Sequence, residues 1–218
     1  MAHSHVHDSS LRKSIITFDG RWSPALEQYR VIRSNIKFLD RENATRNIVV
    51  TSPRCGTGSS TTAVNLAISM ALRGDKVLLI DTNLRKPILH SALRVPNHSG
   101  LTDILMGSTT LEKTVHNTEV GGLHLLTCGP VHPYMDELLG SMAMKILLSD
   151  VKLKYDSVIL DCPAILEATD AALLSNLADG VILVIESGRT KKESAAEAHK
   201  ALKRANANVL GVVLNNRK

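Results

Sequence analysis

Aromatic side chains are scarce in this sequence, at 3% of its 218 residues. Proteins that hold single-stranded nucleic acid stack its bases on aromatic rings, so a role of that kind is not expected. The chain carries 26 Lys and Arg against 21 Asp and Glu, and its net charge of +5 is spread without a dense run of like charge. This mild excess suits small anionic ligands, and we expect no nucleic acid as a partner.

Cysteine is also rare, and the three residues Cys55, Cys128 and Cys162 lie far apart without a Cys-x-x-Cys pair. This spacing argues against a disulfide framework and a zinc site, and it favours a reducing compartment. The sequence has no apolar run of the ~20 residues that a membrane span needs. Its first residues are polar and rich in histidine, unlike a secretory signal. We therefore expect a soluble, cytoplasmic protein.

The segment 1–22 is polar and has no sustained period, and we expect a flexible arm there. Its alternating His3, His5 and His7 could bind a metal, although a solvated tail or a cloning remnant is the simpler interpretation. The remaining residues, 23–218, have the length and apolar content of one domain.

Short apolar segments alternate with segments of helical periodicity through this domain. We expect strands at 48–50, 76–80, 123–127, 157–160, 180–186 and 209–214. We expect helices at 23–39, 61–73, 135–154, 169–177 and 191–205, with short helical pieces at 101–106 and 111–116. This alternation predicts an α/β fold, doubly wound, with a mostly parallel central sheet and helices on both faces. Such a three-layer, Rossmann-like arrangement is that of P-loop nucleoside triphosphatases.

A glycine-containing stretch between the first strand and the second helix is the centre of the functional argument. Ser52-Pro-Arg-Cys-Gly-Thr-Gly-Ser-Ser-Thr61 joins a buried strand to a helix. Backbone N–H groups of such a loop and of the helix N-terminus can cradle phosphate. The position at which a phosphate loop normally carries lysine is Ser59. The alternative is that Gly56 and Gly58 only make a tight turn.

Polar residues follow two other predicted strands, at Asp81 to Arg85 and at Asp161. In parallel sheets the carboxyl ends of the strands bind ligands, so these residues are expected near the loop. A phosphate loop with two strand-end aspartates is suited to hold a nucleoside triphosphate and Mg²⁺. Either aspartate alone would more often be a helix cap or a surface residue.

The motifs resemble those of the bacterial tyrosine kinases (BY-kinases) of capsule and exopolysaccharide synthesis. That family belongs to the deviant P-loop ATPases, which include septum-site and plasmid-partition ATPases. Its motif Glu-x-x-Arg-x-x-Arg matches Glu27-Gln-Tyr-Arg30-Val-Ile-Arg33, and its second motif matches Leu78-Leu-Ile-Asp-Thr-Asn-Leu-Arg-Lys-Pro87. Its third motif, a strand followed by Asp-x-Pro-Pro, matches Ile159-Leu-Asp-Cys-Pro-Ala164. The resemblance covers residues 23–216.

The resemblance implies a role for each matching residue. Asp81 would be the catalytic base, Asp161 would orient a metal-bound water, and Arg85 would lie near the acceptor. ATP would lie against the loop, with Mg²⁺ held by Ser60, Asp81 and Asp161. The implied nucleotide-binding residues are Arg54, Gly56, Thr57, Gly58, Ser59, Ser60, Thr61 and Asn215, the last near the adenine. In the family Glu27, Arg30 and Arg33 would join subunits into a ring, although a solvated helix face is the simpler interpretation of these three.

The sequence departs from the family pattern at Ser59 for lysine, Asn83 for aspartate and Ala164 for proline. The family's tyrosine-rich tail has no counterpart in residues 1–218. Arg54 stands where partition-type loops carry an extra lysine. It either replaces the missing charge or is an exposed loop residue.

The function inferred from the resemblance is that of an ATP-binding protein of exopolysaccharide or capsule export. Its partner would be a membrane polysaccharide co-polymerase, fused or separate, that keeps it at the inner face of the membrane. The intact Asp81, Ser60 and Asp161 favour a tyrosine kinase with ATPase activity, whereas Ser59 and Asn83 favour a weak or inactive regulator. The helix that carries Glu27, Arg30 and Arg33 argues against a third function, that of a partition-type ATPase switch.

Overall fold

The computed structural model describes residues 11, 14–16, 23–39, 46–130 and 135–216. Its centre is a seven-stranded sheet with the order β3-β4-β2-β5-β1-β6-β7. All neighbouring strands pair in parallel except β3 and β4, which are antiparallel. The strands are β1 (Asn47–Thr51), β2 (Val77–Asp81), β3 (His116–Asn117), β4 (Leu123–Leu126), β5 (Ser157–Asp161), β6 (Gly180–Glu186) and β7 (Val209–Asn215).

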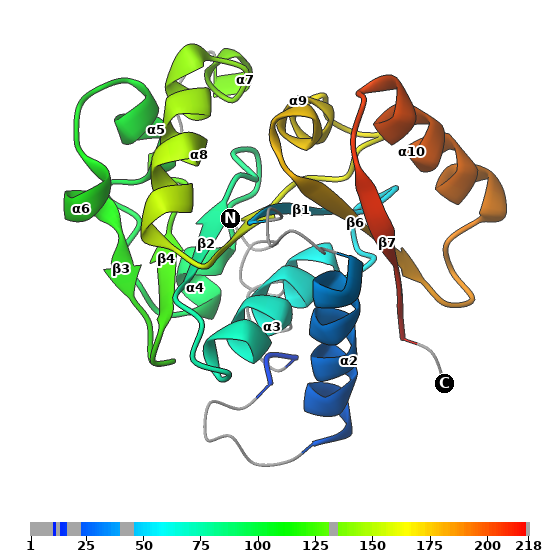
Figure 1. Ribbon diagram of the computed structural model, residues 1–218. Coiled ribbons are helices and arrows are strands. Elements are labelled where there is room, and N and C mark those ends of the chain that lie inside the picture. The colour runs from blue at the N-terminus through cyan, green and yellow to red at the C-terminus, as the bar shows by residue number, and fades with distance from the viewer. Residues whose placement is uncertain (1–10, 12–13, 17–22, 40–45, 131–134, 217–218) are drawn as a thin grey trace.

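Helices cover both faces of this sheet (Figure 1). One hydrophobic core cluster lies under α2 (Pro24–Leu39), α3 (Ser59–Ala71) and α4 (Leu89–Ala92). The other lies under α5 (Leu101–Leu105), α6 (Leu111–Thr114), α8 (Met142–Lys154), α9 (Asp170–Leu177) and α10 (Lys192–Arg204). The short helix α7 (Met135–Leu138) precedes α8. No helix in the described ranges is both long and apolar enough to cross a membrane. The predicted three-layer α/β fold is confirmed.

The central strands are buried on both faces, and their alternation decides which side chains meet which helices. In β1, Ile48 and Val50 belong to the cluster beneath α2 and α3, whereas Val49 belongs to the opposite cluster. Leu79 in β2 and Ile159 in β5 also face α2 and α3. Successive side chains along a strand alternate between faces. The strand-end aspartates, two residues beyond Leu79 and Ile159, therefore point to the face on which α3 begins.

Helix α2 begins where the sequence predicts it. The Ser23 Oγ accepts the Leu26 N–H at 3.1 Å, as an N-cap serine should, and the proline that follows needs no partner for its nitrogen. All six predicted strands are present, with ends within about a residue or two of those expected. The predicted helices at 23–39, 169–177 and 191–205 are likewise confirmed.

The single helix expected at 135–154 is wrong, because α7 and α8 are separate helices. Helix α7 ends at Leu138, and Ser141 begins α8 by accepting the Met144 N–H on its Oγ at 3.3 Å. A glycine at position 140 and a serine that caps a new helix interrupt the apolar period at this point. The short strand β3 and the helix α4 were not expected.

The described part of the N-terminal segment packs on the domain, which differs from the flexible arm expected there. Leu11 and Ile16 are buried in the cluster beneath α2 and α3. The Ile16 N–H donates to Asn65 Oδ1 at 2.9 Å, and Asn65 Nδ2 donates to the Ser14 carbonyl at 3.0 Å. A buried asparagine of α3 thus satisfies backbone groups of a preceding segment. His3, His5 and His7 lie outside the described residues.

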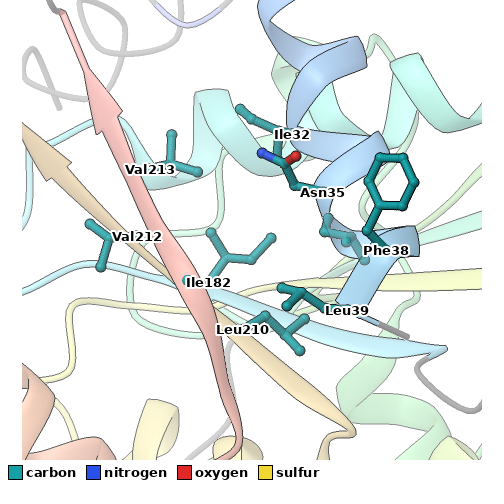
Figure 2. A pocket seen from close by; sticks show the side chains of 10 residues that line it. Ile32, Asn35, Phe38, Leu39, Ile182, Leu210, Val212 and Val213 are labelled. Carbon is teal, nitrogen blue, oxygen red and sulfur yellow. The ribbon is translucent and has the colours of Figure 1, made fainter. Parts of the chain in front are cut away.

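Strand β7 is an edge of the sheet, and an apolar groove runs between it and α2. The groove has a volume of about 370 Å³ and is lined by Ile32, Asn35, Ile36, Phe38, Leu39, Ile182, Leu210, Gly211, Val212 and Val213. Figure 2 shows Leu210 of β7 on the side of the strand that faces α2, whereas the Val212 side chain points away from α2. Phe38 and Val212 expose 78% and 56% of their surface.

Candidate phosphate-binding site

The predicted phosphate loop leaves β1 at the centre of the sheet and ends at the N-terminus of α3 (Figure 1). Two of its glycines have left-handed backbone angles, with φ of 82° at Gly56 and 89° at Gly58. Gly58 is the N-cap of α3, and its carbonyl accepts the Thr62 N–H and the Thr62 hydroxyl, both at 2.9 Å. The glycines therefore let the chain turn back tightly enough to direct a helix N-terminus at the loop interior.

Hydrogen bonds within the loop fix its first residues and leave the backbone N–H groups of residues 56–61 available to a ligand. The Arg54 carbonyl accepts the hydroxyls of Ser52 and Thr57 at 2.9 and 3.2 Å. Among the described residues, no acceptor is found for the backbone N–H groups of residues 56–61. A row of unpaired N–H groups at a helix N-terminus attracts anions, so the loop geometry fits phosphate. The alternative of a simple tight turn leaves these donors unexplained.

Asp81 and Asp161 end neighbouring strands and are register partners across β2 and β5. Both are fully buried. The sequence predicted that these two residues would converge with the loop, and the sheet order, with β5 between β2 and β1, places all three strand ends side by side.

The Asp81 carboxylate is held by the chain that follows it. It accepts the N–H groups of Asn83 at 3.2 Å, Ile88 at 3.2 Å and Leu89 at 3.1 Å. Burial raises the pKa of Asp81 to about 7, and the three hydrogen bonds offset only part of that effect. A carboxyl group with a pKa near neutrality is well matched to the work of a general base.

Asp161 lacks such support. Neither of its carboxylate oxygens has a hydrogen-bond partner among the described residues. Burial, and then the neighbouring Asp81, raise the pKa of Asp161 well above its ordinary value, while the nearby Ser60 hydroxyl lowers it. Ser60 thus lies close to Asp161 without meeting the geometry of a hydrogen bond.

This donor set fits Mg²⁺. Magnesium is held by one or two carboxylates, a hydroxyl, phosphate oxygens and water rather than by an all-protein cage. An orphaned, buried Asp161 beside Asp81 and Ser60 supplies the protein part of such a shell. The described residues contain no group of three or more His, Cys, Asp or Glu side chains suited to a metal. Oxygen atoms of a bound phosphate and of water would complete the shell.

Asn215 lies at the end of β7 and contacts the loop directly. Its Nδ2 donates to the Thr57 carbonyl at 2.9 Å. A Cβ on Gly58 would lie 2.2 Å from the same Nδ2. The structure thus brings Asn215 to the phosphate loop, and whether an adenine binds beside it stays a prediction.

Arg85 lies in the loop after β2 and contacts the carboxylate of Asp170. Its Nε lies 3.6 Å from Asp170 Oδ2, and half of its side chain is exposed while Asp170 is buried. Asp170 begins α9, so the pair links the loop after β2 to that helix. Sequence inspection did not single out Asp170, because a carboxylate in the first turn of a helix has an ordinary explanation.

Ser59 and Arg54 sit at opposite ends of the loop. Ser59 is the first residue of α3, and Arg54 is exposed.

Glu167 was not singled out from the sequence, yet its Oε1 accepts the Cys55 N–H of the loop at 3.1 Å. The two residues are 112 positions apart, and no local pattern could have indicated their contact.

The three residues of the predicted oligomerisation motif differ in their surroundings. Glu27 and Arg30 form an exposed ion pair at 3.1 Å on α2. Arg33 instead donates from its Nη1 to the carbonyl of Ser69 in α3, with the Ser69 Oγ 3.4 Å away. Burial and the neighbouring Arg73 lower the pKa of Arg33. Arg33 therefore joins two helices of the same chain.

A strand–loop–helix with open N–H groups, next to two strand-end aspartates, defines a P-loop nucleotide-binding domain. Comparison with known proteins narrows the class. A family model described as an AAA domain matches residues 45–210. Tyrosine-protein kinase YwqD of Bacillus subtilis is 42% identical over 210 residues, which are 96% of this chain and 89% of that protein.

Solved structures give the same result. The chimerical protein CapA2B2 has a TM-score of 0.89 at 36% identity, covering 94% of this chain and 90% of that one. The kinase domain of Escherichia coli tyrosine kinase ETK has a TM-score of 0.87 at 30% identity, covering 92% and 80%. The chain therefore belongs to the bacterial tyrosine kinase family of P-loop ATPases.

Proposed function

We propose that this protein binds ATP with Mg²⁺ and transfers its γ-phosphoryl group to tyrosine slowly. The proposal rests on the buried pair of Asp81 and Asp161 beside the phosphate loop. Burial raises the pKa of Asp81 to about 7, and the Asp161 carboxylate has no hydrogen-bond partner among the described residues. A buried carboxylate without partners is costly, and such strain is characteristic of sites that a ligand completes.

Each residue near the loop has a chemical task in this reaction. Asp81 receives the proton of the tyrosine hydroxyl, since its pKa of about 7 leaves it a competent base near neutral pH. Asp161 and Ser60 hold the magnesium side of the site. The metal ion, when bound, neutralises charge that develops on the phosphates. Backbone N–H groups from Gly56 to Thr61 orient the phosphate chain.

The proposal of slow transfer rests on two substitutions in the site. A lysine at position 59 would place a positive charge where negative charge develops during transfer, and the serine cannot. Loss of one preorganised charge-stabilising donor lowers the rate by ~10²–10³. Asn83, whose N–H holds Asp81, also lacks the charge that an aspartate would add near the metal.

The decisive experiment is γ-phosphoryl transfer from ATP with Mg²⁺ to a tyrosine-containing peptide. The double variant Ser59→Lys, Asn83→Asp should transfer ~10²-fold faster than the natural chain, because it restores both charges. Asp81→Asn in the double-variant background should remove the gain, since the base is lost. Equal rates for the natural chain and the double variant would contradict the proposal of a weakened site.

Arg54 is the residue that could supply a compensating charge. It is exposed at the start of the loop, and its carbonyl is the acceptor for Ser52 and Thr57. Since the carbonyl does not depend on the side chain, Arg54→Ala tests the charge without removing these bonds. A drop in ATP affinity would favour compensation, and unchanged affinity would leave Arg54 as a surface residue.

A second candidate function is that of a regulator which binds nucleotide but transfers no phosphate, and Ser59 favours it. Both functions place the protein in exopolysaccharide or capsule export. It would act on the cytoplasmic side of the membrane and reach it through a polysaccharide co-polymerase, fused or separate. Phosphate transfer above background by the natural chain would exclude the inactive regulator.

We further propose that copies of the chain assemble through the outer face of α2. Glu27 and Arg30 support this, because both are exposed and their ion pair with each other can be exchanged for pairs with a second copy. Arg33 acts within the chain instead, through Ser69. The apolar groove beside the same helix continues this surface to β7 (Figure 2).

A further inference from the structure

Two side chains from outside the phosphate loop are bonded to its backbone. Asn215 Nδ2 donates to the Thr57 carbonyl at 2.9 Å, and Glu167 Oε1 accepts the Cys55 N–H at 3.1 Å. The first contact lies two residues before α3 begins, and the second lies four residues after β1 ends. In the part of the chain that the structure describes, no other outside side chain bonds to residues 52–56. Glu167 therefore holds the first half of the loop.

The segment that carries Glu167 is itself fixed to the end of β1. The Thr51 hydroxyl donates to the Pro163 carbonyl at 2.7 Å, and the Ile165 N–H donates to the Ser52 carbonyl at 2.9 Å. These bonds continue the contact of β1 with β5 past the ends of both strands. Glu167 follows two residues later, so its bond joins the loop to a segment that is already anchored.

The peptide group between Arg54 and Cys55 is held at both ends. Its carbonyl accepts the hydroxyls of Ser52 and Thr57 at 2.9 and 3.2 Å, and its N–H donates to Glu167. The backbone N–H groups that follow this peptide have no acceptor among the described residues. Because each peptide plane constrains the next, a fixed peptide at this position limits the directions in which the open N–H groups can point.

We propose that Glu167 is a positioning residue that holds the phosphate loop in its nucleotide-binding shape before the nucleotide binds. The inference rests on the proposed nucleotide-binding function and adds a residue to it. A loop that is already ordered loses less conformational entropy on binding, so its affinity for the ligand is higher. ADP and ATP use the same N–H cradle, and the gain should therefore be equal for both. In this role Glu167 contacts the loop and not the nucleotide.

Glu167→Ala and Glu167→Gln separate the hydrogen bond from the charge. Both variants lose the negative charge, but only glutamine keeps a carbonyl oxygen that can accept the Cys55 N–H. Isothermal calorimetry with ADP, and with a slowly hydrolysed ATP analogue, each with Mg²⁺, measures the two affinities. We expect Glu167→Ala to bind each nucleotide about threefold to fivefold more weakly than Glu167→Gln does, the size of one exposed hydrogen bond.

Cys55→Pro provides a second test of the same contact. Cys55 and Gly56 lie in a turn, and Gly56 has a φ of 82°. Turns with a glycine of positive φ as third residue commonly take proline as second residue, which is the place of Cys55. Proline has no N–H and restricts its own φ, so Glu167 would have no donor left to hold. In the Cys55→Pro background, Glu167→Ala and Glu167→Gln should bind nucleotide with equal affinity.

Cleavage by trypsin reports the contact without any nucleotide. Trypsin cuts after arginine, and the exposed Arg54 precedes the bond to Cys55, whose N–H Glu167 holds. Cleavage requires local opening of the loop, so its rate follows the population of the opened loop. In the ligand-free protein, Glu167→Ala should be cut after Arg54 about three to five times faster than Glu167→Gln.

The outcomes separate the two proposals. Binding of neither nucleotide by the natural chain would overturn the nucleotide-binding function and this inference with it. Nucleotide binding with equal affinities for Glu167→Ala and Glu167→Gln would overturn the inference alone, as would equal rates of cleavage after Arg54. A loss confined to the ATP analogue, or a difference that persists in the Cys55→Pro background, would show that Glu167 acts other than through the Cys55 N–H and would likewise overturn it.

Discussion

Two aspartates end adjacent strands with no exposed surface, and they dominate the electrostatics of the site. Like charges on register partners repel, and burial removes the water that would weaken the repulsion. The pKa of Asp81 is raised to about 7 and that of Asp161 is raised well above its usual range. In the ligand-free protein the pair therefore holds protons that exposed aspartates would release.

This raised pKa makes folding stability depend on pH. Between pH ~4, where the unfolded aspartates release protons, and pH 7, where folded Asp81 does, the folded chain binds more protons than the unfolded chain. The free energy of unfolding should therefore fall as the pH rises through this window, and fall further as Asp161 ionises. Asp161→Asn should be more stable than the natural chain at pH 8, by on the order of a few kcal/mol, and should lose that advantage near pH 4.

Urea unfolding between pH 4 and 8.5 without Mg²⁺ measures this difference. Asp150→Asn, a change at an exposed position of α8, should show no such trend. Added Mg²⁺ should favour the ionised pair and reduce the advantage of Asp161→Asn at pH 8. A stability difference that is independent of pH would show that the aspartates are not a strained acid pair.

The sequence identified these acids and the loop because each follows an apolar strand or precedes a helix. It could not indicate how the loop is held. Glu167 and Asn215 contact Cys55 and Thr57 from 112 and 158 residues away. Such contacts depend on tertiary packing, which no local spacing records.

At the scale of elements, the long periodic segments were predictable and their interruptions were not. The apolar positions of 135–154 continue across Gly140, so the period alone predicts one helix. The new start depends on the cap at Ser141, whose Oγ accepts the Met144 N–H. Strand β3 has only two residues and owes its existence to pairing with β4.

The strand–loop–helix element depends on Gly58 more than on Gly56. Both have positive φ, so alanine costs about 1–2 kcal/mol at either position. At Gly58 the new Cβ would also lie 2.2 Å from Asn215 Nδ2, whereas at Gly56 it meets nothing within 4 Å. Gly58→Ala should therefore destabilise the protein more than Gly56→Ala in urea unfolding.

Asn215→Ala separates the two effects in Gly58→Ala. In the Asn215→Ala background the extra cost of Gly58→Ala should shrink toward that of Gly56→Ala, because the clash partner is gone. An undiminished difference would mean that the strain lies in the backbone of Gly58 rather than in its contact with β7.

The contact of α2 with α3 rests partly on Arg33. Its guanidinium binds the carbonyl of a fully buried serine, Ser69. Arg33→Ala should lower the free energy of unfolding by about 1–2 kcal/mol, because a charged hydrogen bond to a buried acceptor is lost. Arg30→Ala should change it by less than about 0.5 kcal/mol, since its pair with Glu27 is exposed. Similar losses for both variants would show that the Arg33 contact with Ser69 contributes no more to folding stability than the exposed pair of Arg30 does.

At the scale of the whole molecule, the alternation of strands and helices predicted the layers but not the order of strands. Asp81 and Asp161 become neighbours because β5 lies between β2 and β1. The same order leaves β7 as an edge with seven residues and no charged side chain. Natural edge strands are usually shortened, charged or covered, so this edge favours pairing with another chain.

The proposed assembly surface therefore consists of the outer face of α2 and the exposed apolar residues beside it. Phe38 exposes 78% and Val212 56% of its surface, on α2 and β7 respectively. A lysine at either position should oppose association, because burying an unpaired charge against a second copy is unfavourable. Sedimentation of the natural chain should show a mass that rises with concentration, and Phe38→Lys and Val212→Lys should shift it toward the monomer.

Leu153→Lys provides the matched control. Leu153 exposes 87% of its surface on α8, which packs on the opposite face of the sheet from α2. The substitution makes the same change of charge at an apolar surface residue far from the groove. Loss of association by Leu153→Lys as well would indicate a general effect of added charge. Association that survives Phe38→Lys and Val212→Lys but is lost in Arg30→Glu would restrict the contact to the charged face of α2.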